Sequence, residues 1–102
     1  MVRFLVLYPT PDDVEAFERH YTEVHIPLAK KLPALRSYNV ARDVRAVRGE
    51  RFYLVAELEW DDFASLQRDF ASPEGQATAR DVDRLAELCP GIRSVIYETQ
   101  SV

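Results

Sequence analysis

The spacing of apolar residues changes several times along this chain, and this change constrains the fold more than any other feature. Apolar residues alternate with others at 51–60, as in a strand, and recur every three or four residues at 14–32, as in a helix. Further strands are expected at 2–8, 35–43 and 92–99, and two more helical segments lie between the strands at 51–60 and 92–99. This order predicts an α+β, ferredoxin-like βαββαβ fold, in which the helices cover one face of a four-stranded antiparallel sheet. Residues 1–102 are expected to form a single domain.

Capping residues and prolines predict where the helices begin and break. Thr10 is expected to cap the first helix, and Asp61 and Ser72 are expected to cap the two later segments. Pro27 lies inside the first helical pattern, where it removes one backbone hydrogen bond. We therefore expect the first helix to kink or restart just after His25.

The face of the sheet that the helices leave bare is expected to be apolar. Leu5, Leu7, Val55 and Val95 share this face in the predicted strands, whereas an exposed sheet face normally carries polar side chains. The same face of a second copy is the simplest cover, which predicts a two-fold homodimer through the sheet. The alternative is a monomer with an apolar sheet surface.

Charge and composition exclude several classes of protein. A net charge of −4 argues against nucleic-acid binding, because phosphate recognition needs a concentrated basic surface. The apolar N-terminal strand is too short to span a membrane and lacks the features of a secretory signal, so a cytoplasmic protein is expected. Cys89, the single cysteine, is interpreted as a packing residue.

His25 is the main candidate for chemistry. With Tyr21 one turn before it, it lies on the apolar stripe of the first helix. Apolar surroundings lower the pKa of an imidazole and favour its neutral form, which accepts a proton or donates a directed hydrogen bond. The alternative is a buried histidine whose hydrogen bonds are satisfied by a backbone carbonyl or by Tyr21.

No metal or organic cofactor is expected. His20 lies off the stripe and is interpreted as a solvated residue, and its five-residue separation from His25 makes the two side chains diverge on a continuous helix. No phosphate-binding loop, dinucleotide motif or C-x-x-C motif occurs in the sequence. A cavity between helices and sheet would suit an apolar or aromatic ligand, and its expected lining is Tyr8, Phe17, Leu28, Trp60, Phe63 and Phe70.

Two strings of residues resemble the EthD family of the dimeric α/β-barrel superfamily. They are Tyr21-x-x-x-His25-x-Pro27-Leu28-Ala29 and Ala71-Ser72-Pro73-Glu74-Gly75-Gln76, and the resemblance extends over nearly all of the chain. It implies ferredoxin-like subunits whose sheets pack face to face, with a hydrophobic small molecule between the helices and the sheet. Members of this family are often described as oxidoreductase-like. Only His25, with Tyr21 beside it, matches the residues that the family motif carries.

Two functions remain open at this point. The first is a cofactor-independent oxidoreductase, monooxygenase, isomerase or cyclase acting on a small hydrophobic, oxygenated or aromatic compound, with His25 as acid or base and Tyr21 orienting the substrate. The second is a non-catalytic protein that binds a metabolite or assists a monooxygenase partner. A third possibility is that side chains of the protein fill the cavity, in which case the protein is only a scaffold.

Overall fold

The computed structural model describes residues 1–102 and contains one four-stranded antiparallel sheet. The strand order is β2-β3-β1-β4, so β1 pairs with β3 on one side and with β4 on the other. The strands are β1 (Val2–Tyr8), β2 (Ser37–Ala41), β3 (Leu54–Trp60) and β4 (Arg93–Glu98). Each strand lies inside a predicted range, and the edge strand β2 is four residues shorter than predicted (37–41 against 35–43).

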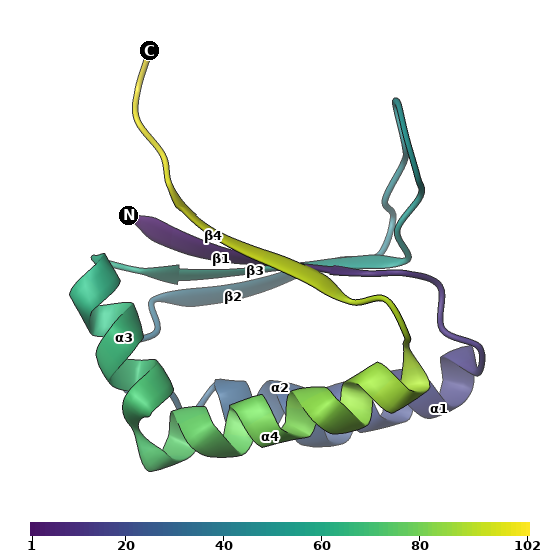
Figure 1. Cartoon of the computed structure of the whole chain (residues 1–102), viewed down its shortest axis with the longest axis horizontal. Helices are drawn as coiled ribbons and strands as arrows, with labels where there is room; N and C mark the ends of the chain where they lie inside the picture. Colours follow the sequence, from purple (N-terminus) through teal and green to yellow (C-terminus); the bar gives the residue numbers. More distant parts are fainter.

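All helices lie on one face of the sheet (Figure 1). The first helical run consists of α1 (Val14–His20), η1 (Tyr21–His25) and α2 (Ile26–Ala29), and the second consists of α3 (Phe63–Ala71) and α4 (Pro73–Leu88). In Figure 1 the long helix α4 lies beside α1 and α2, beneath the sheet. This arrangement confirms the predicted ferredoxin-like α+β fold. None of the helices combines the length and the apolar character needed to cross a membrane.

The first helical run contains a π-helical turn where the sequence predicted an interruption. In η1 the Ile26 N–H donates to the Tyr21 carbonyl, five residues earlier, instead of to the residue four earlier. Pro27 has no N–H to donate, and it lies in the first turn of α2, where that loss costs least. The backbone stays helical through His25 and Ile26, so the predicted interruption takes the form of a changed hydrogen-bond pattern and not of a gap in the helix. Val24, an apolar residue within the predicted helical pattern at 14–32, is exposed in this turn.

Two of the three predicted helix caps are displaced. The first helix begins at Val14, where Asp13 accepts a hydrogen bond from the Ala16 N–H at 3.0 Å, so Thr10 is not its cap. Asp62, not Asp61, caps α3. In both places the acid nearer to the first helical residue reaches the free amides. Ser72 caps α4 as predicted.

The core lies between the helices and the sheet, and a buried acid joins the two layers. Trp60 is fully buried, and its indole Nε1–H donates to Asp69 at 2.7 Å. Asp69 also accepts the Ala34 N–H, with its two carboxylate oxygens at 3.0 and 3.2 Å. One carboxylate thus ties α3 to β3 and to the connection that leads into β2.

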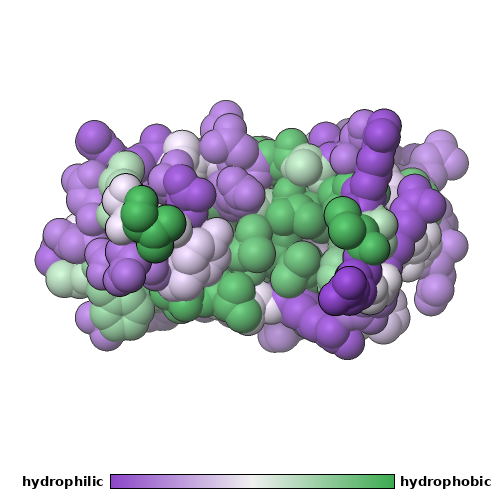
Figure 2. Space-filling view, turned by 90° about the horizontal axis from the view of Figure 1, so that it is seen from above, coloured by the Kyte–Doolittle hydropathy of each residue, from purple (hydrophilic) through white to green (hydrophobic).

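The opposite face of the sheet is apolar at its centre. In the strand register Leu5 pairs with Val95 and Leu7 pairs with Val55, and these four residues share the face that carries no helix. Figure 2 shows this face, with hydrophobic residues in the middle and hydrophilic residues toward both ends. The predicted clustering of the four residues is confirmed.

Candidate functional site

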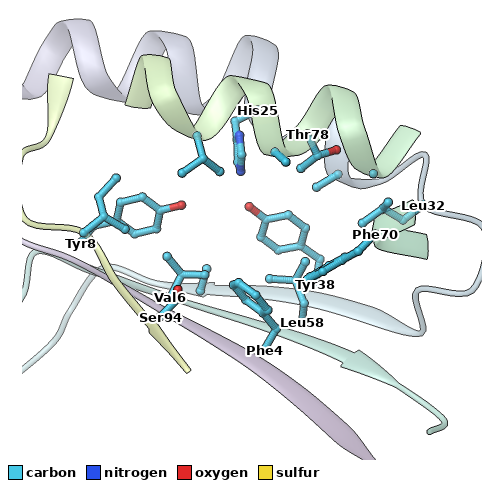
Figure 3. Close-up of a pocket in the computed structure, with 16 residues that line it drawn as sticks. Phe4, Val6, Tyr8, His25, Leu32, Tyr38, Leu58, Phe70, Thr78 and Ser94 are labelled. Carbon is cyan, nitrogen blue, oxygen red and sulfur yellow. The ribbon is translucent and has the colours of Figure 1, made fainter. Parts of the chain in front are cut away.

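A cavity of about 190 Å³ lies between the helices and the sheet (Figure 3). Twelve of its sixteen lining residues are hydrophobic. An apolar cavity of roughly 150 Å³ binds benzene in a well-studied engineered protein, so this space suits a molecule built on one small ring. The lining consists of Phe4, Val6, Tyr8, His25, Ala29, Leu32, Tyr38, Ala56, Leu58, Phe70, Gly75, Thr78, Ala79, Val82, Ile92 and Ser94.

The cavity opens between α4 and β4. Ala79, Val82 and Ser94 are lining residues that are also exposed to solvent, and they belong to this helix and to this edge strand. Phe70, at the end of α3, is another partly exposed lining residue. A hydrophobic ligand therefore has a path from solvent that does not require the sheet to open.

His25 is held in this cavity by a carboxylate on the neighbouring helix. Its Nδ1 lies 2.9 Å from Oδ2 of Asp81 in α4, and the histidine side chain is 7% exposed. An ionised carboxylate only accepts hydrogen bonds, so the imidazole donates its Nδ1–H to Asp81. In the neutral ring Nε2 then carries a lone pair, and Figure 3 shows this end of the ring pointing into the cavity.

The environment of His25 favours this neutral form. Burial lowers the pKa of His25 below its usual 6.5, and the nearby His20 lowers it further, while the hydrogen bond and the charge of Asp81 oppose the shift. The cavity thus presents an imidazole that is ready to accept a proton at neutral pH. The alternative interpretation named a backbone carbonyl or Tyr21 as the hydrogen-bond partner of a buried His25, and the structure corrects that partner to Asp81.

His20 also contacts Asp81, contrary to the prediction that it is a solvated residue. Its Nε2 donates to Asp81 Oδ1 at 2.7 Å, and its side chain is 20% exposed. The two histidines were expected to diverge, but the π-helical turn between them brings both onto the side of α4. The structure contains no group of three or more His, Cys, Asp or Glu side chains arranged to hold a metal ion.

Two tyrosine hydroxyls face His25 across the cavity. Figure 3 shows Tyr8 from β1 and Tyr38 from β2 with their hydroxyl groups directed toward each other beneath the imidazole. The Tyr38 hydroxyl also lies 2.7 Å from that of Tyr21. Burial raises the pKa of Tyr38 to about 12 and raises the pKa values of Tyr8 and Tyr21 further above their usual 10. These hydroxyls are therefore neutral donors at physiological pH.

The predicted site residues take different places in the structure. Tyr8 and Phe70 line the cavity together with His25, as expected. Tyr21 stacks against the His25 ring, with centroids 5.7 Å apart, but it is not a lining residue, and its hydroxyl contacts Tyr38.

Four of the residues expected around the ligand do not line the cavity. Phe17 and Trp60 are fully buried in the core and are not lining residues of the cavity. Phe63 lies at the first position of α3 and is exposed, and the side chain of Leu28 is half-buried outside the cavity. The predicted placement of Phe17, Leu28, Trp60 and Phe63 is corrected accordingly.

Asp81 and Tyr38 were not among the predicted site residues. Asp81 lies four residues before the buried Leu85 in α4, so a carboxylate occupies the inward-facing stripe of that helix. Tyr38 alternates with the outward-facing residues of β2 and pairs with Leu58 on the helix side of the sheet. Two features of the sequence could have indicated them: Asp81 is an acid on an apolar helical stripe, and Tyr38 is a tyrosine at an inward-facing strand position.

Known proteins share this fold and part of this sequence. The EthD domain model matches residues 11–88. An uncharacterized 11.0 kDa protein from the thcB–thcC intergenic region of Rhodococcus erythropolis is 33% identical over 87 residues, which is 84% of each chain. The crystal structure of an EthD family protein from Bacillus halodurans has 37% identity and a TM-score of 0.86, covering 98% of this chain and 99% of that one.

A more distant structure supports the fold alone. A dimeric protein of unknown function with a ferredoxin-like fold, from Bacteroides fragilis, has 23% identity and a TM-score of 0.64, covering 96% of this chain and 95% of that one. The resemblance carried by the Tyr21–Ala29 and Ala71–Gln76 strings is confirmed by the family model, which spans both. The chain belongs to the EthD domain family.

Proposed function

We propose that this protein binds a small hydrophobic compound with a carbonyl or phenol oxygen, and that His25 removes a proton from it. The observation that carries this proposal is the imidazole fixed by Asp81 at 2.9 Å, with its Nε2 directed into an apolar cavity. A base held in this way is already oriented and needs no reorganisation when a ligand enters. General-base catalysis of this kind contributes roughly 10²–10⁴-fold to a rate.

The tyrosine hydroxyls would stabilise the negative charge that forms when the proton leaves. When a proton leaves the carbon beside a carbonyl, it passes to His25 Nε2, and the electron pair of the broken C–H bond moves toward the carbonyl oxygen. Tyr8 or Tyr38 then donates a hydrogen bond to the negative charge that develops on that oxygen. The product is an enolate that lies between the protonated His25 and a tyrosine hydroxyl.

This single step is common to the reactions that we consider. An enolate or phenolate leads to isomerisation by protonation at another carbon, to aldol-type ring closure, or, with dioxygen as the oxidant, to oxygenation without a cofactor. The cavity volume limits the reacting part of the substrate to about one small ring. We therefore place the protein among cofactor-independent oxidoreductases, isomerases or cyclases of single-ring compounds.

Deuterium exchange tests the proposed step without knowledge of the natural substrate. Phenylacetone is a single-ring ketone with exchangeable hydrogens, and its exchange in D₂O is followed by proton NMR. His25→Asn keeps a donor toward Asp81 but removes the nitrogen that faces the cavity. We expect wild-type protein to accelerate exchange and His25→Asn to lose about 10²–10⁴-fold of this acceleration.

Controls separate catalysis from binding. Glu15→Gln, at an exposed position of the first helical run, should exchange the ketone as wild type does. Ligand-induced shifts in the protein spectrum should persist in His25→Asn. Binding without any exchange by wild-type protein, over a series of single-ring ketones, would reject the base and leave the second candidate, a metabolite-binding or accessory protein.

The proposal includes a homodimer formed through the open sheet face. The apolar centre made by Leu5, Leu7, Val55 and Val95 supports it, as does the dimeric state stated for the Bacteroides fragilis structure. Leu5→Arg should give a monomer in light scattering. Thr22→Ala, on the exposed side of the first helical run, is the matched control and should leave the mass unchanged. A wild-type protein that is monomeric at all concentrations would contradict this part of the proposal.

A further inference from the structure

His20 makes the second hydrogen bond to the carboxylate that holds His25, and it does so from outside the cavity. It lines a shallow hollow between the first helical run and α4, whereas His25 lines the ligand cavity. The exposed fraction of the His20 side chain is 20%, against 7% for that of His25. Asp81 therefore lies between an imidazole that reaches solvent and an imidazole that reaches the ligand.

We propose that His20 is a positioning residue for His25, which fixes the Asp81 carboxylate and limits how far its charge stabilises a protonated His25. The proposal rests on the role of His25 as the base. One carboxylate fully compensates only one imidazolium, so the three groups take up protons as a coupled set. A positive charge on the outer ring opposes protonation of the inner ring, because both rings contact the same carboxylate.

The consequence is a base that stays in its active form at lower pH. In a simple Asp–His pair the carboxylate favours the imidazolium, which has no lone pair to accept a substrate proton. Here Asp81 already receives the His20 N–H at 2.7 Å, and that donor draws part of its charge away from His25. Asp81 still orients His25 through their hydrogen bond, but it raises the basicity of His25 less than it would in a simple Asp–His pair.

Other titratable and charged groups surround the two histidines. Arg19 and Glu23 from the first helical run and Arg84 from α4 line the hollow beside His20. Arg84 is already paired with Glu87 at 2.9 Å. On the cavity side, His25 stacks on Tyr21, and the neutral hydroxyls of Tyr8 and Tyr38 lie across from it. Asp81 is the carboxylate that contacts both rings.

The test is a titration of the two histidines by NMR. The chain contains two histidines, so ¹⁵N-histidine labelling gives two imidazoles, which His20→Gln assigns. The glutamine amide retains a donor toward Asp81 and cannot take up a proton. We expect the midpoint of His25 to move to higher pH in this variant, and the acid limb of the deuterium-exchange rate to move in the same direction.

Matched measurements keep the outcome unambiguous. Arg84→Gln removes a positive charge from the same hollow without touching Asp81, so it should move the His25 midpoint much less than His20→Gln. In wild-type protein the NMR titration curve of His25 should show two inflections, one of them caused by His20. This measurement does not depend on the folding of any variant. An unchanged midpoint in His20→Gln, an equal shift in Arg84→Gln, or a single inflection would overturn the proposal. The NMR shift without deuterium exchange would instead reject the proposed reaction and retain the coupling.

Discussion

The imidazoles of His20 and His25 contact opposite oxygens of the Asp81 carboxylate, although five residues separate them along one helical run. In a regular α-helix this separation turns two side chains about 140° apart. The π-helical turn from Tyr21 to His25 widens the spiral and returns both rings to the same side. The geometry of the site thus depends on a local backbone irregularity, which is a common companion of functional sites.

Replacing Asp81 by asparagine should impair the base without removing it. The amide offers an acceptor to only one histidine and places an NH₂ group against the other, so His25 loses either its partner or its orientation. We expect the deuterium-exchange rate to fall at least about tenfold, with ligand binding retained. Asp83→Asn, on the exposed side of the same helix, is the matched control. Equal rates for wild type and Asp81→Asn would show that the carboxylate does not orient the base.

The buried His25 should make the folded state sensitive to acid. Its pKa in the folded protein lies below the usual 6.5, so the unfolded chain takes up this proton first as the pH falls. Stability contributed by the neutral ring is therefore present above about pH 6.5 and is lost as the pH falls below it. Urea unfolding at pH 7.5 and pH 5 should show this loss, and His25→Asn should reduce it. A larger acid sensitivity in the variant would contradict the sign.

The tyrosines of the cavity should make the folded state sensitive to alkali. Burial raises the pKa values of Tyr8, Tyr21 and Tyr38, so these hydroxyls keep their protons in the folded state at a pH where the unfolded chain loses them. Stability should fall as the pH rises above about 10. The increase in tyrosinate absorbance should then coincide with loss of the circular dichroism signal. Complete ionisation of all five tyrosines in a protein that remains folded would contradict this account.

Much of the fold could be predicted because it depends on the periodicity of apolar residues. The alternation at 51–60 identified the face of β3 that packs on the helices, and Leu54, Ala56, Leu58 and Trp60 are all buried there. Element ends were less well predicted, since Asp13 caps the first helix three residues after the expected Thr10, and Asp62 caps α3 in place of the adjacent Asp61.

The site could be predicted only in part. His25 was expected at the cavity because an imidazole on an apolar stripe is unusual, and Tyr8 because aromatic residues suit an apolar ligand, and both are lining residues. Asp81 was missed because an acid on a helix is usually solvated, and its partner His25 lies 56 residues away in the sequence. The placement of His20 could not follow from regular helix geometry, because no periodic signal marks the π-helical turn.

Asp69 should be essential for stability and unimportant for the chemistry of the site. Its carboxylate accepts the buried indole N–H of Trp60 and the backbone N–H of Ala34. Asp69→Ala leaves both donors without a partner, which should cost roughly 2–6 kcal/mol at about 1–3 kcal/mol for each donor. Asp69→Asn keeps an acceptor and should lose less. Urea unfolding measures both, and a loss below about 1 kcal/mol in Asp69→Ala would show that water replaces the carboxylate.

The tautomer of His25 is the most direct test of the site. Long-range ¹H–¹⁵N NMR of histidine-labelled protein, recorded above the pH at which the rings titrate, distinguishes the protonated ring nitrogen of each imidazole. The structure predicts the Nδ1–H tautomer for His25, with Nε2 free to face the ligand, and the Nε2–H tautomer for His20. A His25 ring protonated at Nε2 would leave no lone pair in the cavity and would contradict its role as the base.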